Sequence, residues 1–510
     1  MTLKNTRMPH SPAWGVRFLY FCLLWLWASW WMGDSLRICY ENSFFVADAS
    51  QMRFLLQQSL GWIAAIGRAF ILPMRYPWLG GLILTTVLFT ATMSIARVSH
   101  LPLRWRWLAS LPAIAWMTWV AWLGLNLYYQ SEPGTPFGWL VIAWGIVVIL
   151  DLLLTPIYKR KRVENIPEKV DIRAFFFLPL FIIPFLTTHF RHPYQRPVTQ
   201  MQVQLLNQDW EGMSQTAHDN AELSYRPLAA YYAIALVHTG HLTDQMFDIR
   251  LDYDTLYLKR YGGTPDIGTS YYNIDCNFHA GLFRPATRRA MEHLTMQGPT
   301  LYSLKYLAKL ALAESDWPLA SKYLHILRQQ PFEGEFVSRY SAMLNNADAV
   351  RADTEMATVM RTIPTHDDFE SMYQEPIFLG FNAVRMEFPS AEALMQCLMV
   401  NLYSKRMPDF LYRCQPLIGG TPPKTIAEGL VTQSIKNPSI LQAFPSLNMD
   451  AQTYRVFIST LKNELKDRQA HARALFKDWK GYYPYYYFFG NLRATRPTPK
   501  ESPTDNGAVN

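Results

Sequence analysis

Long apolar runs fill residues 14–190, whereas residues 191–490 carry shorter apolar clusters at helical spacing. A helix needs about 20 predominantly apolar residues to cross a bilayer. Five runs reach about that length by this measure, and they lie near residues 14–33, 77–96, 107–129, 137–157 and 174–190. The pattern predicts an N-terminal transmembrane helix bundle over residues 1–190.

Residues 54–74 form a sixth apolar stretch with a different character. The part between Arg53 and Arg68 is free of charge but short, and it contains Gln57 and Gln58. A stretch of that length is typical of an interfacial or re-entrant helix rather than a span. We therefore expect an interfacial helix over residues 54–74.

Basic residues predict which side of the membrane each loop occupies. Lys and Arg gather in residues 97–106 and 158–173, and cytoplasmic loops collect such residues. With five spans and a non-spanning 54–74, both loops and the N-terminus are cytoplasmic, and the C-terminal half lies outside the cytoplasm. Asp151 is the one acid within a predicted span, and we expect it to reach the basic cluster at residues 159–162 or to pair there.

The stretch "AESDWPLASKYLHIL", residues 313–327, introduces the second half of the chain. Shifted back by 34 residues, Ser315, Trp317 and Ala320 align with Gly281, Phe283 and Ala286. This frame resembles the tetratricopeptide repeat, in which two helices form a hairpin with small residues at their contact. Further copies are expected at residues 205–217, 231–247 and 393–414.

The repeats predict an all-α chain in which a helical domain over residues 191–490 follows the transmembrane bundle. Stacked hairpins build an α-solenoid with an extended concave groove, which typically binds a protein or peptide partner. In the hairpin that contains residues 313–327, Ala320 is expected to pack at the contact between the two helices, and Asp316 is expected to start the second helix. Residues 491–510 are polar and are predicted to be disordered.

Composition narrows the function only slightly. The net charge of +8 is largely accounted for by loops that flank the membrane, so it does not indicate a nucleic-acid partner, and the lipid bilayer is the expected partner of the first half. The five cysteines include no C-x-x-C pair. We expect no cofactor and no metal.

Motifs for chemistry are sparse. No P-loop, G-x-G-x-x-G, H-E-x-x-H or G-x-S-x-G occurs. The weak catalytic candidates are Glu41, which directly follows the first span, and the D-x-D pair Asp252 and Asp254. A D-x-D pair arises readily by chance and is most often a solvated loop. His279, His293 and His325 are expected to be isolated histidines.

Several segments together resemble a known family: "YENSFFVADASQMRFLLQQSLGWIAAIGRAF", "YPWLGG", "GLFRPATRRAMEHL", "LASKYLHIL" and "YYPYYYFFG". They are similar to an uncharacterised family of multi-pass membrane proteins from Bacteroides-type bacteria. The resemblance implies a bacterial inner-membrane location and assigns no activity. The position of Glu41 is also reminiscent of multi-pass glycosyltransferases that use lipid-linked sugars, which carry an acid in the first external loop.

Two functions remain open after this reading. The first is a membrane-anchored periplasmic helical-repeat module that binds or assembles a partner, and it is not an enzyme. The alternative is a membrane transferase that acts on an envelope glycan or lipid.

Overall fold

The computed structural model describes residues 12–58, 60–101, 103–124, 133–159, 175–192, 194–221, 226–251, 274–365, 389–461 and 468–490. Every regular element among these residues is a helix, and they include no strand. The predicted all-α class is therefore confirmed.

The chain folds as two compact units. Unit 1 contains residues 1–199 together with two short later segments, 299–302 and 328–333. Unit 2 contains residues 200–298, 303–327 and 334–510.

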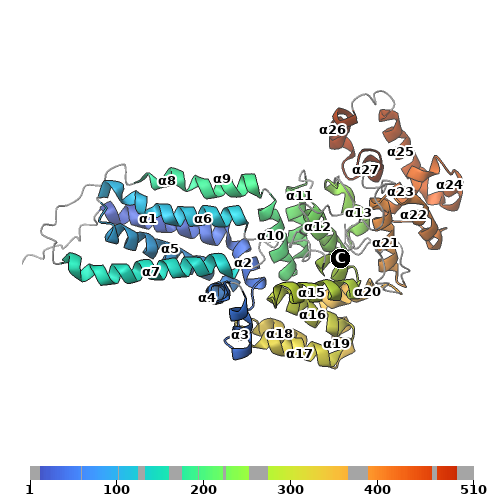
Figure 1. Ribbon diagram of the computed structural model, residues 1–510. Helices are drawn as coiled ribbons and strands as arrows, with labels where there is room; N and C mark the ends of the chain where they lie inside the picture. The colour runs from blue at the N-terminus through green and yellow to red at the C-terminus, as the bar shows by residue number, and fades with distance from the viewer. Residues whose placement is uncertain are drawn as a thin grey trace, which may run out of the picture. The chain divides into compact units, whose positions relative to one another are not determined.

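The longer helices of unit 1 run side by side in a bundle, and α2, α3 and α4 lie at one end of it (Figure 1). They are α1 (Pro12–Leu26), η1 (Trp27–Trp31), α2 (Gly33–Glu41), α3 (Ala49–Gln57), α4 (Gly61–Ile71), η2 (Leu72–Arg75), α5 (Pro77–Val98), η3 (Leu103–Ser110), α6 (Leu111–Leu123), α7 (Gly134–Lys159), α8 (Phe177–Leu180), α9 (Ile182–Arg191) and α10 (Gln195–Leu206), which continues into unit 2. The long helices α5 and α7 and the shorter α6 follow the apolar runs of the sequence.

Two described helices are long and apolar enough to cross a membrane, where the sequence predicts about five. They are α5 and residues Gly134–Thr155 of α7. The other predicted spans form shorter or interrupted helices: α1 passes into the π-helical turn η1, α6 is preceded by the 3-10 helix η3, and Phe177–Arg191 is a shorter apolar helix. The end of the predicted span 107–129 lies outside the described residues.

The stretch predicted as one interfacial helix is broken into two helices, α3 and α4. Leu60 adopts a left-handed φ of 58° between them, and the 11 residues of α4 give a length of about 16 Å. That length is short of the ~30 Å hydrocarbon core of a bilayer. The break therefore agrees with a segment that does not span.

Helices α4 and α7 cross with glycine backbones in contact. A Cβ atom added at Gly67 would lie 1.7 Å from the carbonyl oxygen of Gly134, and one at Gly138 would lie 2.1 Å from that of Ile63. Small residues spaced four apart allow such close approach between helices in membranes. Only glycine fits the crossing without moving one backbone.

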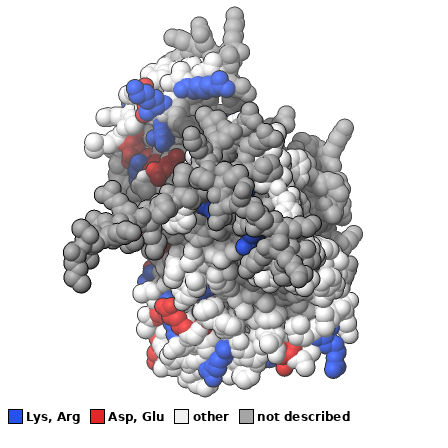
Figure 2. All heavy atoms as spheres, turned by 90° about the vertical axis from the view of Figure 1, so that its left-hand side faces the viewer, with Lys and Arg blue, Asp and Glu red and all other residues white. Residues whose placement is uncertain are grey.

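The outside of unit 1 is apolar. Large side chains of α7 such as Ile149, Leu152 and Leu153 are exposed. Figure 2 shows one face of the molecule, on which basic and acidic side chains are scattered among uncharged ones without a broad patch of one sign. An exposed apolar surface of this kind marks contact with lipid or protein.

Asp151 pairs with a basic residue of another helix, and the side chains of the basic cluster predicted as its partner, residues 159–162, lie outside the described residues. The buried carboxylate of Asp151 lies 2.6 Å from the guanidinium of Arg97 on α5. The indole of Trp144 likewise donates to the hydroxyl of Thr90, 2.9 Å away. Both contacts join residues 54 positions apart, because α5 and α7 lie parallel, and this alignment places Arg97 beside Asp151.

Unit 2 is built from short helices, many of them paired. They are α11 (Trp210–Asp219), α12 (Arg226–Thr239), α13 (Leu242–Gln245), η5 (Met246–Asp248), α15 (Phe283–Gln297), α16 (Leu301–Ala313), α17 (Trp317–Arg328), α18 (Gly334–Ser341), α19 (Ala347–Ala352), α20 (Thr354–Arg361), α21 (Ala391–Tyr403), α22 (Met407–Arg413), η7 (Gln415–Leu417), α23 (Lys424–Ser434), α24 (Ser439–Ala443), η8 (Pro445–Leu447), α25 (Asn448–Thr460), α26 (Arg468–Trp479) and α27 (Tyr483–Phe489). Residues 301–302 of α16 and residue 328 of α17 belong to unit 1.

One turn geometry recurs five times between paired helices. Each turn has a residue with positive φ, and the next N–H donates to the carbonyl five residues earlier, as in a Schellman motif. The positive-φ residues are Gln208, Gly240, Gly281, Ser315 and Lys405. The hydrogen bonds are Asp209 to Gln204, His241 to Leu236, Leu282 to Asn277, Asp316 to Ala311 and Arg406 to Asn401, all 2.8–2.9 Å.

The next helix begins two residues after each positive-φ position, and it begins with an apolar residue: Trp210, Leu242, Phe283, Trp317 or Met407. The alignment of Ser315 with Gly281, found in the sequence, therefore corresponds to two copies of one backbone turn. Ala320 is fully buried, and the carboxylate of Asp316 accepts the N–H of Leu319 at 3.1 Å. Both positions play the parts predicted for them.

Candidate functional site

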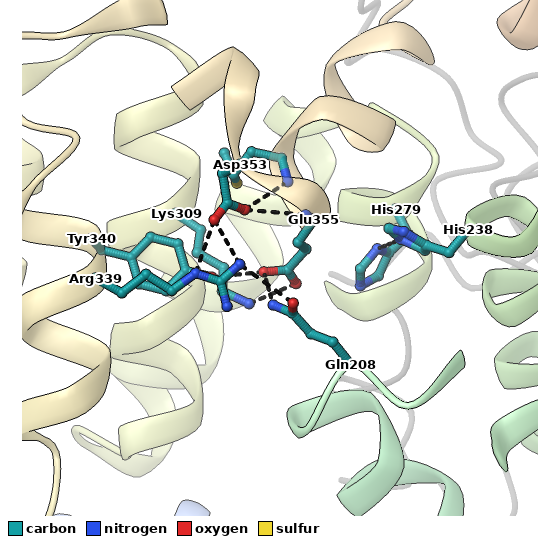
Figure 3. Close-up of polar contacts among 9 residues, drawn as sticks. Gln208, His238, His279, Lys309, Arg339, Tyr340, Asp353 and Glu355 are labelled. Atoms are coloured by element: carbon teal, nitrogen blue, oxygen red, sulfur yellow. Dashed lines mark hydrogen bonds and ion pairs between the residues drawn. The ribbon is translucent and has the colours of Figure 1, made fainter. Parts of the chain in front are cut away.

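A buried carboxylate, Glu355, is contacted by polar side chains from three other parts of unit 2 (Figure 3). The ammonium of Lys309 on α16 lies 2.8 Å from its Oε1 atom. The hydroxyl of Tyr340 on α18 donates to Oε2 at 2.7 Å, and the amide of Gln208 donates to the same oxygen at 3.1 Å. Glu355 itself lies in the first turn of α20 and is 2 % exposed.

The charges of this cluster are fixed by its contacts. Burial by itself raises the pKa of Glu355, but the charge of Lys309 and the hydrogen bonds from Lys309 and Tyr340 outweigh burial and lower that pKa to about 2. Burial and the neighbouring Glu355 charge raise the pKa of Tyr340 well above its usual value. Glu355 is therefore an anion and Tyr340 a neutral donor at neutral pH.

Asp353 holds Glu355 in position. It is the N-cap of α20, and its Oδ1 atom accepts the N–H groups of Glu355 and Met356, each at 3.1 Å. The guanidinium of Arg339 donates to the other oxygen of Asp353 through Nε at 2.9 Å and Nη2 at 2.6 Å. Nη2 also donates to Gln208 at 3.3 Å, so the cap, the cation and the amide form one network.

Three aromatic rings surround the ammonium of Lys309. Its Nζ atom lies 5.2 Å from the ring centre of Tyr306 and 5.7 Å from those of Phe278 and Tyr340. Ring faces attract a cation most strongly where water is excluded. The rings and Glu355 together compensate for the burial of this charge.

Two histidines lie next to the cluster in Figure 3. Nε2 of His238 and Nδ1 of His279 are 2.9 Å apart, and Trp210 stacks on His238 with ring centres 3.8 Å apart. Burial lowers the pKa of His238 to about 4 and that of His279 well below its usual value. Both rings are therefore neutral at neutral pH, and one donates its N–H to the other.

This arrangement favours a fixed network over a reacting one. Glu355 and His279 are buried, Lys309 and His238 are partly buried, and each of the four contacts another member of the network. Among the described residues, no three His, Cys, Asp or Glu side chains are grouped so that they could hold a metal ion. A buried polar network of this kind can specify one arrangement of the surrounding helices.

Glu41, the first catalytic candidate from the sequence, lies at the end of α2 in unit 1. It is 0 % exposed, and its Oε1 atom is 2.6 Å from the guanidinium of Arg37, one turn earlier. Asp252 and Asp254, the other two candidates, lie outside the described residues. The structure therefore places Glu41 in a buried ion pair.

The neighbours of Glu41 bind the later segment 328–333 within unit 1. The hydroxyl of Tyr40 lies 2.7 Å from the carbonyl oxygen of Pro331 and 2.8 Å from a carboxylate oxygen of Glu333. The N–H of Phe45 donates to the side chain of Gln330 at 3.1 Å. The residues that follow the first apolar helix thus serve as a docking surface for a distant part of the chain.

The sequence reading missed the Glu355 cluster and the histidine pair. Lys309 and Glu355 are 46 residues apart, and His238 and His279 are 41 residues apart. His279 was expected to be isolated, and it is not. One sequence signal was available. Gln208 occupies the position that Ser315 occupies in its own turn, so its side chain could be expected where two helices meet.

The model of one protein family, described as "Family of unknown function (DUF6057)", matches residues 115–490. That match covers most of the chain, so the chain belongs to this family. No curated protein and no solved structure matches the chain.

Proposed function

We propose that this member of the family is a membrane-anchored helical-repeat protein whose second half binds or assembles a protein or peptide partner. The observation that carries the proposal is the turn repeated five times in unit 2, each copy placing an apolar residue at the start of the next helix. Repeated hairpins of one geometry stack into an α-solenoid, which offers a groove rather than a catalytic centre. We also propose that these hairpins are tetratricopeptide-like repeats, as the spacing of the sequence predicts.

Five membrane crossings are also proposed. Helix α1 and the π-helical turn η1 together run without a break from residue 12 to residue 31, and η3 with α6 runs from 103 to 123. At 1.5 Å per residue each run measures roughly 30 Å. Exposed Trp14 and Trp30 lie near the two ends of the first run, as aromatic residues do at membrane interfaces.

The proposed location is the inner membrane of a Bacteroides-type bacterium, with the N-terminus cytoplasmic and the repeat domain periplasmic. The basic loops 97–106 and 158–173 support this orientation. A reporter pair tests it: alkaline phosphatase fused after residue 191 should be active, and a cytoplasmic reporter fused there should be inactive. The reverse result would show that a sixth segment crosses.

A membrane transferase acting on an envelope glycan or lipid is the second candidate, because Glu41 follows the first apolar helix. The burial of Glu41 and its contact with Arg37 favour a structural role. Removing one partner of a buried ion pair leaves a charge without compensation, whereas removing both is often tolerated. Glu41→Gln alone is therefore expected to lower the amount of folded protein.

The discriminating experiment is complementation of a deletion strain with the double variant Arg37→Met/Glu41→Gln. A binding module should regain normal protein level and normal function when both charges are removed. A transferase that uses the Glu41 carboxylate should fail to complement although the protein accumulates normally. Normal accumulation without complementation would therefore overturn the binding module in favour of the transferase.

A further inference from the structure

The last helix, α27, is held onto unit 2 by hydrogen bonds to one helical hairpin. The hydroxyl of Tyr483 donates to the carbonyl of Leu402 at 3.1 Å, and that of Tyr486 donates to the carbonyl of Tyr403 at 2.7 Å. The ammonium of Lys405 donates to the carbonyl of Gly490 at 3.2 Å. These contacts attach both ends of α27 to the turn between α21 and α22.

A buried acid makes a further contact with α27. Oε2 of Glu428, on α23, accepts the backbone N–H of Tyr483 at 2.8 Å. The side chain of Asp248 lies close to Gly481, where an added Cβ would be 2.3 Å from the carboxylate. Gly481 has a φ of +81°, a backbone conformation that favours glycine. The turn at Gly481 thus leads into α27 next to two acidic side chains, Glu428 and Asp248.

The surroundings of Glu428 disfavour its charged form. Burial is the largest cause, and it raises the pKa of Glu428 to about 7 although the N–H of Tyr483 and the charge of Lys424 act to lower it. The charges of Asp450 on α25 and Asp248 after α13 raise it further. Glu428 thus exchanges its proton near neutral pH.

The remaining elements packed against α23 add little charge. Helix α24 has no charged residue, and Glu392 on α21 faces Arg361 at 3.7 Å. Lys480, before α27, acts on Asp248, as does His218. Tyr482 stays neutral because burial and the charge of Glu428 raise its pKa.

We infer that α27 is a pH-sensitive latch: it is held on unit 2 while Glu428 is protonated, and its hold weakens when Glu428 loses that proton as the pH rises through neutrality. Ionisation places a third negative charge near Asp248 and Asp450 at a buried position. In the proposed released state Glu428 is exposed to solvent. The polar groups of Leu402, Tyr403 and Lys405 then lose their partners on α27.

The direction follows from linkage. A carboxyl whose pKa is higher in the docked state than in water binds more protons when docked, so the docking constant is largest at low pH, falls between the two pKa values and stays constant above the higher one. With about 7 for the docked state and an ordinary value in the released state, the docking constant falls by about tenfold between pH 6 and pH 8.

Hydrogen–deuterium exchange of the full-length protein in detergent tests the latch. After correction for the intrinsic pH dependence of exchange, the amides of residues 483–490 should exchange about tenfold faster at pH 8 than at pH 6. In Glu428→Gln, which keeps an acceptor for the Tyr483 N–H, the corrected rates should not change with pH. A flat profile in the unaltered protein, or the same rise in Glu428→Gln, would overturn the inference.

Two further variants keep the test informative if Glu428→Gln does not fold. Asp248→Asn removes a negative neighbour and should shift the midpoint of the transition to lower pH, whereas Lys424→Gln removes a positive one and should shift it to higher pH. The corrected exchange rates of residues 483–490 at a series of pH values give the midpoint for each variant. Shifts in the same direction, or no shifts, would contradict a role for Glu428.

Discussion

The two units differ in their outer surfaces and in the residues that bring their helices together. Unit 1 exposes large apolar side chains such as Leu152, and its closest helix contact is made by Gly67 and Gly138. Unit 2 buries Ala320 and Leu324 in its interior. Both units hold buried charge, Glu41 with Arg37 in unit 1 and Glu355 with Lys309 in unit 2. At the proposed membrane location, the apolar side chains of unit 1 gain little by leaving lipid, so close backbone contact joins its helices, whereas burial away from water stabilises unit 2.

This contrast shows what determines the arrangement of helices in each unit. In unit 1 the shape of the backbone contact determines which helices pair. In unit 2 apolar burial supplies the stability, and the Glu355 network selects the arrangement in which all its partners are satisfied. Substitutions at the backbone contact of unit 1 and in the Glu355 network of unit 2 are therefore expected to lower stability by different amounts.

The largest effect is expected from Lys309→Met. The substitution leaves the buried carboxylate of Glu355 without its cation, and breaking a buried pair in this way costs about 3–5 kcal/mol. Denaturant unfolding of the purified protein should show the loss. Lys322→Met removes the same charge from an exposed position of α17 and should leave stability unchanged. Equal stability of the two variants would mean that charge enclosure does not organise unit 2.

A smaller effect is expected from Gly138→Ala in unit 1. The new methyl group would overlap the backbone of α4, and overpacking of this kind costs about 1–3 kcal/mol. The control is Gly145→Ala on the same helix, where an added Cβ meets no atom within 4 Å. Thermal inactivation in detergent should separate the two variants. If both behave alike, the glycine contact is not what joins α4 to α7.

The smallest effect compares two copies of the repeated turn. Asp316 and Asp209 both cap the helix that follows, accepting the N–H of Leu319 at 3.1 Å and of Gly212 at 2.9 Å. Replacing either with Ala should cost about 1 kcal/mol. Arg406→Ala, at the matching position of a turn without a side-chain cap, should cost less. Unequal costs at Asp316 and Asp209, measured by unfolding, would show that the copies are alike only in backbone shape.

Local patterns in the sequence predicted the helices better than their partners. The span expected at 77–96 corresponds to Pro77–Val98, and the cap at Asp316 depends on residues that are neighbours in the chain. Asp151 was expected to pair within its own helix end, but its partner Arg97 comes from another helix. The spacing of residues along the sequence does not predict a pair between distant residues, because such a pair depends on how whole helices align.

The same reasoning explains why the Glu355 cluster was not predicted. Gln208 and Glu355 are 147 residues apart, and neither has an unusual local sequence. The D-x-D pair, Asp252 and Asp254, was easy to find but lies outside the described residues. A single sequence therefore reveals short motifs more readily than clusters of distant residues that only the fold brings together.

The repeated turn also determines the order in which unit 2 can fold. Each hairpin joins neighbouring residues, so its loop closes early and at low entropic cost, and hairpins can form one after another as the chain is synthesised. The bond from Gln208 to Glu355 cannot form until residue 355 has been made. Before that point the hairpins that carry Gln208 and Lys309 can form, but the contacts of these two side chains with Glu355 cannot. We therefore expect an early intermediate of correct helices in variable arrangement, and a late step in which Glu355 arrives and fixes them.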